Sequence, residues 1–234
     1  MSQIQGAIAA GHEKTAEAAR LILQDGGNAF DAVIASLLTA CVTEPVLTSL
    51  GGGGFLLAKM YSGEEILYDF FVQTPLQKKR DAATNFFPIS ADFGTAQQEF
   101  YIGPASVATP GTVKGLFAIH KDLCSIPLNR LAEPAVELAR DGFKINSFQS
   151  GILDIVKPVY FSTNEARRIF RSRNKNRTLI QENEMLKQPE LADFIENLAQ
   201  MGETLFYEGE IAGAVERLCL EKGGHLTSGD FKKY

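Results

Sequence analysis

The feature that most constrains the fold is a run of four glycines, Gly51 to Gly54, directly before the apolar segment FLLAKMY (55–61). A phosphate-binding loop would need a helix after its glycines and a Gly-Lys-Ser/Thr ending. Here the following residues are typical of a strand, so neither a P-loop nor a dinucleotide fingerprint fits. Two interpretations stay open: a tight start to a buried strand, or bare backbone N–H groups that line a ligand pocket or an oxyanion site.

The glycines open a predicted hairpin. The segments FLLAKMY (55–61) and EILYDFFVQ (65–73) flank a short turn at Ser62-Gly63. The first segment is apolar on both faces, which predicts a sheet covered on both sides. Alternation in the second segment gives two sets of side chains, with Ile66, Tyr68, Phe70 and Val72 on one face and Leu67, Asp69, Phe71 and Gln73 on the other.

Helices are predicted on either side of the hairpin. Residues 12–27 end at a glycine pair, and residues 28–45 begin with Asn28 as N-cap and Asp31 three positions later. Further helices are predicted at 111–123, 128–142 (kinked or split by Pro134), 146–156, 164–172, 189–202 and 208–224. Residues 83–109 predict a long loop with a short element or two. This layout predicts helices and sheet in layers with a helical lobe.

Composition excludes some broad classes. The chain has 234 residues, enough for one large domain or two small ones, and 45% of them are hydrophobic. Its net charge of −5 argues against a general nucleic-acid or membrane-surface binder. The N-terminal residues lack a basic segment and a long apolar stretch, so we expect a cytoplasmic protein unless a leader was trimmed.

Isolated reactive residues give weak signals. Cys41, Cys124 and Cys219 lie far apart, which favours buried or inert thiols over a disulfide or metal role. No His, Cys or carboxylate spacing resembles a zinc site, and there is no G-x-S-x-G nucleophile motif. Asp31, Glu44 and Asp69 are acids in apolar surroundings, where a structural, hydrogen-bonded role is favoured over a catalytic one.

A basic stretch occupies residues 167–177. It reads RRIFRSRNKNR and contains no acid. Such a cluster can hold phosphates, and a nucleic-acid binder would show steeply salt-dependent retention on DNA or heparin. In an otherwise acidic chain, a solvated loop is the favoured interpretation.

Several segments together resemble the gamma-glutamyltranspeptidase family. They read, in family order, DGGNAFDAVIASLLTACVTEP, LGGGGFLLA, GPASVATPGTVKGLFAIHKDL, LAEPAVELARDGF and QPELADFIENLAQMGETLFYEGEIAGAVERLCLEKGGHLTSGDFKKY. GGNA-x-DA and the tetraglycine before Phe55 are good single signals, and together with P-G-T-V-x-G-L they are highly specific. The resemblance covers almost the whole chain.

The resemblance implies an α+β fold, part of an αββα N-terminal-nucleophile hydrolase sandwich with a helical lobe. It divides the chain into 1–80, helices plus the core hairpin, and 110–234, a mainly helical lobe. It also implies a proenzyme that cleaves itself into a large and a small subunit. The threonine freed by this cleavage attacks the carbonyl of a gamma-glutamyl or related amide, and water or an acceptor amine resolves the acyl-enzyme. No metal or organic cofactor is implied.

The threonines depart from the family pattern. None of Thr15, Thr39, Thr43, Thr48, Thr109 and Thr227 sits in the nucleophile motif, so the processing site and nucleophile are expected beyond Tyr234. We expect these residues alone to lack transpeptidase and hydrolase activity. Missing neighbouring strands would leave apolar surface and sheet edges that favour self-association.

The second strand departs from the pattern as well. The family reads D-x-R-E-x-A-P where this chain reads DFFVQTP (69–75), so Phe71 stands at the arginine position. That arginine pairs with the donor's α-carboxylate, which a phenyl ring cannot do. The hypothesis is an amidohydrolase with a more apolar donor pocket, whose predicted substrate-binding residues are Phe71, Gln73, Gly52 and Gly53. Two alternatives remain: Phe71 as core packing with no pocket nearby, and a non-catalytic or substrate-diverged relative with a binding or structural role.

Overall fold

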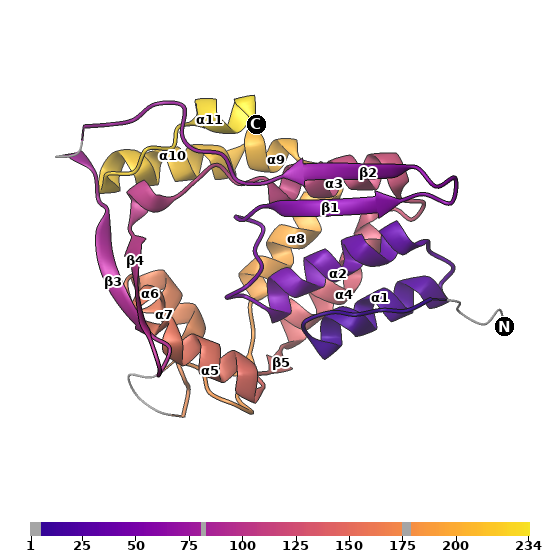
Figure 1. The fold of residues 1–234 in the computed structure, drawn as a ribbon, viewed down its shortest axis with the longest axis horizontal. Helices are drawn as coiled ribbons and strands as arrows, with labels where there is room; N and C mark the ends of the chain where they lie inside the picture. Colours follow the sequence, from indigo (N-terminus) through magenta and orange to yellow (C-terminus); the bar gives the residue numbers. More distant parts are fainter. Residues whose placement is uncertain (1–5, 81–82, 175–178) are drawn as a thin grey trace.

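The computed structural model describes residues 6–80, 83–174 and 179–234, and Figure 1 shows their helices together with short hairpins that lie toward the edge of the molecule. The helices are α1 (Glu13–Gln24), α2 (Ala29–Thr43), α3 (Thr112–Leu123), α4 (Leu128–Asp141), α5 (Ser147–Ile155), α6 (Lys157–Tyr160), α7 (Asn164–Phe170), α8 (Pro189–Met201), α9 (Thr204–Tyr207), α10 (Glu210–Lys222) and α11 (Ser228–Lys233), with a 3₁₀ turn η2 (Pro104–Ser106).

The strands form three two-stranded antiparallel sheets. The pairs are β1 (Gly54–Lys59) with β2 (Glu65–Phe70), β3 (Phe87–Asp92) with β4 (Gln97–Ile102), and β5 (Phe143–Lys144) with β6 (Met185–Leu186). The α+β class is therefore confirmed. None of the described helices has the length and apolar character to cross a bilayer.

Helix α2 begins where the sequence predicts. The Asn28 side chain accepts hydrogen bonds from Phe30 N and Asp31 N, and Asp31 Oδ2 accepts from Asn28 N at 2.8 Å. Asp31 also accepts from the backbone N and hydroxyl of Ser125 and from Ile126 N, at 2.7 to 3.0 Å. This buried carboxylate thus ties the start of α2 to the segment that follows α3.

One hydrophobic core joins the N-terminal helices to the later ones. Helix α2 packs against α1 and α4, and α4 packs against α8. Helix α4 runs unbroken through Pro134, so the expected split does not occur. Burial of its apolar face stabilises the helix and compensates for the backbone hydrogen bond that proline cannot donate. The buried residues of this face are Leu131, Ala132, Ala135, Val136 and Ala139. The division of the chain into 1–80 and 110–234 stays a prediction.

Residues 83–109 were predicted as a long loop with a short element or two, and this underestimates their order, because β3 and β4 pair along six residues each to form a hairpin there. Its turn is closed by Phe93 N donating to Ala96 O at 2.9 Å and by Gly94 N donating to Asp92 Oδ1 at 2.8 Å. Ala91 is the one fully buried residue in the two strands. With so little burial, the alternation that signals a strand is absent from the sequence.

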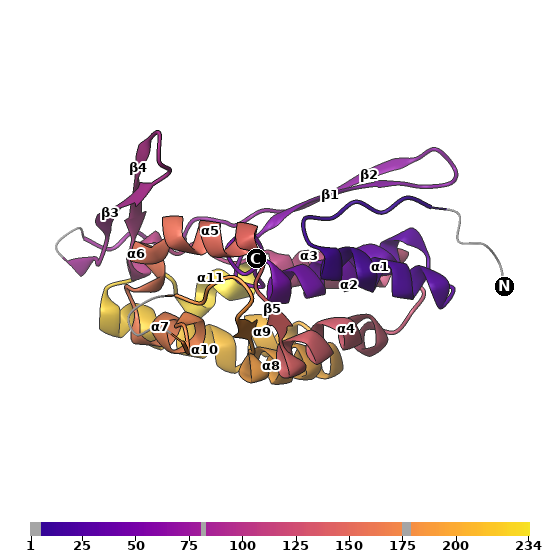
Figure 2. The same cartoon turned by 90° about the horizontal axis from the view of Figure 1, so that it is seen from below.

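The β1–β2 hairpin is confirmed, but the expectation that both its faces are covered is wrong for the described residues. Ala58 and Phe70 are buried, and α3 packs against β2. In Figure 2 the hairpin lies on one side of the helical layer, and no other described element lies beyond it. An apolar strand pattern predicts that a face is to be covered, and not which part of a protein covers it.

Candidate functional site

The glycine run connects the hairpin to the start of α3. Gly52 O accepts hydrogen bonds from Gly111 N at 2.8 Å and from Thr112 N at 3.0 Å. The N–H of Gly52 donates to Ser49 O at 3.1 Å. Gly52 therefore fixes the loop against the first residues of α3, and its own N–H is already used within the loop.

Gly53 is the glycine that the backbone requires. A Cβ placed there would lie 2.6 Å from both Phe70 O and Val72 N. By contrast, a Cβ at Gly51 would meet nothing closer than the Ser49 hydroxyl, at 3.7 Å. The geometry at Gly53 fits the interpretation of a tight strand start, in which two backbones approach too closely for a side chain.

Phe71 directly follows β2 and lies on the open side of the hairpin. Its ring stacks on Phe55, with centroids 5.5 Å apart and planes at 15°. Its backbone N donates to Asp69 Oδ1 at 3.0 Å, and its carbonyl accepts from the Tyr234 hydroxyl at 2.8 Å. Since the Phe71 side chain is 54% exposed, it is not a core residue.

Gln73 forms a backbone bridge rather than a side-chain contact. Its N donates to Thr109 O at 3.1 Å, and Thr109 N donates back to Gln73 O at 2.7 Å. The Gln73 residue is exposed. This bridge brings the end of the hairpin beside the segment that enters α3.

A cleft of about 350 Å³ lies against the glycine run. It is lined by Leu37, Pro45, Val46, Leu47, Thr48, Ser49, Gly52, Gly53, Gly54, Phe55, Phe70 and Thr112. Of the four predicted substrate-binding residues, Gly52 and Gly53 line this cleft. Phe71 reaches its edge by stacking on Phe55, and Gln73 lies outside the lining.

The cleft can bind and orient a ligand, but its lining holds no group for proton transfer. Among the described residues that line it, the polar groups are backbone atoms and the hydroxyls of Thr48, Ser49 and Thr112, and none of the side chains ionises near neutral pH. An acid, a base or an activated nucleophile is what acyl transfer requires. The chemistry of an amide cleavage therefore needs a group from elsewhere.

The sequence did not point to Thr112 or Tyr234 as site residues. Thr112 lies in the P-G-T-V segment that helped to reveal the family, which was the available signal. Burial, followed by the charge of Asp69, raises the pKa of Tyr234 above its usual value, so its hydroxyl keeps the proton that it donates to Phe71 O. The contact between Tyr234 and Phe71 spans 163 positions, and no local pattern reports it.

The thiols offer no reactive group near the cleft. Burial raises the pKa of Cys41 to about 12, which leaves it un-ionised and unreactive at neutral pH. None of the three cysteines, Cys41, Cys124 and Cys219, forms a disulfide. Among the described residues, no group of three or more His, Cys, Asp or Glu side chains is placed to hold a metal ion.

The sequence matches a known protein family over nearly its whole length. The sequence profile described as Gamma-glutamyltranspeptidase matches residues 15–234. This chain belongs to the gamma-glutamyltranspeptidase family. The resemblance inferred from the glycine-rich motifs is thereby confirmed.

Curated members of the gamma-glutamyltranspeptidase family match almost all of this chain. It is 30% identical over 232 residues to the glutathione hydrolase proenzyme of Escherichia coli strain K12. The alignment covers 98% of this chain and 38% of that protein. It is 28% identical over 229 residues to glutathione hydrolase 2 of Arabidopsis thaliana, with 98% and 37% covered. The chain thus spans well under half the length of these relatives.

A solved structure of the same family has the same fold. The crystal structure of Helicobacter pylori gamma-glutamyltranspeptidase superposes with a TM-score of 0.85 at 25% sequence identity. The match covers 100% of this chain and 65% of that chain. All of the helices and hairpins described above therefore lie within the region that matches this family member.

Proposed function

We propose that this chain is the large-subunit portion of a gamma-glutamyltranspeptidase-like amidohydrolase or acyltransferase that acts on gamma-glutamyl or related amides. The observation that carries the proposal is the likeness of the whole chain to Helicobacter pylori gamma-glutamyltranspeptidase, at a TM-score of 0.85. The alternative of a non-catalytic relative gains no support from the described residues.

In this proposal the reacting group comes from polypeptide outside these residues. An N-terminal threonine attacks the amide carbonyl through its hydroxyl, and its own α-amine takes the proton. The amine of the substrate leaves, and water or an acceptor amine then takes the acyl group. The cleft beside Gly52 and Gly53 contributes shape and hydroxyl groups, which is consistent with its lack of ionisable side chains.

The outer face of the hairpin is the proposed contact with the small subunit of the same proenzyme. We define the outer face as Phe55, Leu57, Leu67 and Phe71, which are 54% to 70% exposed. Fully burying an apolar side chain of this size typically contributes about 1.5–3 kcal/mol. The outer face is therefore a strong site for association, with the small subunit when it is present and with another copy of this chain when it is not.

The aromatic pair at the edge of the cleft suggests the donor preference. Phe71 and Phe55 present stacked rings where the family's arginine would present a guanidinium. Stacked rings favour an apolar acyl group and offer no partner for a carboxylate. The proposed donor is thus an amide whose acyl part is recognised mainly through apolar contact.

The test is to express the complete gene that contains these codons and to look for two events. We expect self-cleavage into two polypeptides on a denaturing gel, and turnover of acyl anilides, with phenylacetyl anilide compared against gamma-glutamyl anilide. The 234 residues alone serve as the control and should show no turnover. A complete gene product that neither cleaves itself nor turns over any acyl anilide would contradict the proposal.

A further inference from the structure

A second cleft, of about 710 Å³, lies between α7 and the start of α8. Its lining includes the cations Arg168, Arg171, Arg173 and Lys187 and a single acid, Glu190. We call this the basic cleft. In a chain with a net charge of −5, it is a marked local excess of positive charge.

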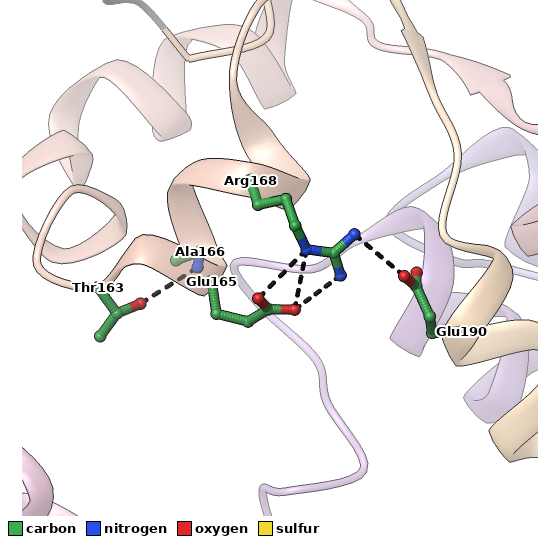
Figure 3. A network of polar contacts seen from close by, with 5 residues as sticks. All are labelled: Thr163, Glu165, Ala166, Arg168 and Glu190. Atoms are coloured by element: carbon green, nitrogen blue, oxygen red, sulfur yellow. Dashed lines mark hydrogen bonds and ion pairs between the residues drawn. The ribbon is translucent and has the colours of Figure 1, made fainter.

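One of the four cations is already compensated, as Figure 3 shows. The Arg168 Nη2 donates to Glu165 Oε1 at 2.7 Å, and its Nη1 lies 3.0 Å from Glu190 Oε1. Both carboxylates raise the pKa of the Arg168 guanidinium, Glu165 having the larger effect. Glu190, the one acid among the described residues that line the cleft, is therefore already paired.

The other three cations have no partner in the chain as described. No hydrogen bond or ion pair of the Arg171, Arg173 or Lys187 side chain occurs within residues 6–80, 83–174 and 179–234. Three like charges gathered at one cleft repel each other, and an anionic ligand would relieve this repulsion.

A further acid, Glu184, holds the segment that carries Arg171 and Arg173. Glu184 accepts hydrogen bonds from the Ser172 hydroxyl at 2.9 Å, from Asn174 N at 3.3 Å and from Gln181 N at 2.7 Å. Burial alone would raise the Glu184 pKa, but these hydrogen bonds outweigh it and hold the pKa below its usual value. The Glu184 carboxylate is thus a structural anchor rather than a counter-ion for the cleft.

This anchoring holds the segment that carries two of the cations. Ser172 is buried, and Arg171 and Arg173, which flank it, both line the basic cleft. Lys187 stands between the buried residues Leu186 and Gln188. Their burial fixes the backbone on both sides of Lys187, so this wall of the cleft is held in place by the core. The part of the basic stretch at 175–177 lies outside the described residues.

We propose that the basic cleft binds a small ligand that carries a polyphosphate group, with Arg171, Arg173 and Lys187 as its charge partners. The planar guanidinium pairs with phosphate through two parallel hydrogen bonds, and three uncompensated cations match an anion of several charges. The volume is typical of small-molecule sites. Ile169 and Pro189 also line the cleft and supply an apolar wall for an organic part.

The test measures binding by titration calorimetry at low salt, with inorganic tripolyphosphate as the probe. The cleft variant is Arg171→Gln with Lys187→Gln. The control variant, Arg217→Gln with Lys121→Gln, removes one arginine and one lysine that are exposed and lie outside the cleft. Far-UV circular dichroism checks the fold, and Arg173→Gln alone replaces the double variant if that variant fails to fold.

We expect tripolyphosphate to bind the parent chain at one site, the cleft variant to bind at least about tenfold more weakly, and the control to stay within about twofold. ATP serves as a second probe: tighter binding than tripolyphosphate would identify a nucleotide source, and equal binding would identify the phosphate group alone. Both results support the proposal.

Four results would overturn it. The first is no binding to the parent chain, and the second is equal weakening in the cleft and control variants. The third is citrate binding as tightly as tripolyphosphate, which would show that the cleft recognises negative charge and not the phosphate group. The fourth is a single-stranded oligonucleotide binding more tightly than either phosphate probe with a steep salt dependence, which would identify a nucleic-acid surface.

Discussion

The two faces of the β1–β2 hairpin have similar apolar sequences and opposite surroundings. On the inner face, Phe70 is 7% exposed, and its ring fits against α3 where Gly115 leaves room for it. On the outer face, Phe55 and Leu57 are more than half exposed. The difference shows that an apolar sequence favours burial of both faces, but does not determine which polypeptide buries each of them.

The largest loss of stability is expected for a substitution on the inner face. Phe70→Ala should destabilise the chain by about 3–5 kcal/mol, because it leaves a cavity between the hairpin and α3. Phe71→Ala, the adjacent change on the outer face, should lose about 0.5–1.5 kcal/mol from its stacking on Phe55. Urea unfolding of the two variants measures both values. Equal losses would show that the two faces do not differ in burial.

The next prediction concerns the helical layer behind the inner face, which Asp31 holds together. Asp31→Asn should cost about 1.5–3 kcal/mol, because the carboxylate accepts charge-assisted hydrogen bonds from Asn28, Ser125 and Ile126. Burial alone would raise the Asp31 pKa, but these hydrogen bonds outweigh it and lower the pKa below its usual value.

The pH dependence follows from the lowered Asp31 pKa. Its stabilisation is complete above the unfolded-state pKa of about 4 and is lost as the pH falls through the lower folded-state pKa. Thermal unfolding between pH 2 and pH 7 should therefore show a smaller acid-induced loss for Asp31→Asn than for the parent chain. Identical acid profiles would rule out this role for Asp31.

The glycine loop at the start of the hairpin gives a matched pair. Gly53→Ala should destabilise by about 1–3 kcal/mol, since its Cβ would press on the backbone of Phe70 and Val72. Gly51→Ala should stay within about 0.5 kcal/mol, because its Cβ meets only the Ser49 hydroxyl at ordinary contact distance. Chemical denaturation separates the two, and a tolerated Gly53→Ala would remove the close-approach argument.

The smallest effect on stability is expected for a change on the outer face. Phe71→Arg should lower the stability of these 234 residues by no more than about 1.5 kcal/mol, the contribution of the stacking on Phe55. In the product of the complete gene, the same change should raise the kcat/KM ratio of gamma-glutamyl over phenylacetyl anilide by about tenfold or more, since a guanidinium can pair with the donor carboxylate. Phe71→Lys is the control, which adds the charge without the planar fork. An unchanged ratio would count against a role of Phe71 in the donor pocket.

Local signals in the sequence predicted much of the fold. The pair Asn28 and Asp31 marked the start of α2, and Ser62-Gly63 marked the turn of the first hairpin. The β3–β4 hairpin was missed because only Ala91 is buried in it, and the short helices α6, α9 and α11 were missed because four to six residues give no clear period.

The site was less predictable than the fold, because its contacts join distant segments. Gly52 and Gly53 were identifiable from the glycine run, whereas the Tyr234 contact with Phe71 depends on the folded chain. In the basic cleft, the sequence shows Arg171 and Arg173 but not that Lys187 joins them. Nor does it show that Glu184 is already engaged by Ser172.

The most direct test of the account is hydroxyl-radical footprinting of the outer face, compared between these 234 residues and the product of the complete gene. If the outer face receives the remainder of the protein, Phe55, Leu57, Leu67 and Phe71 should label several-fold less in the complete product, while the buried Phe70 should label weakly in both. Equal labelling of the four outer residues in the two samples would contradict the claim that this chain is one part of a larger amide-cleaving enzyme.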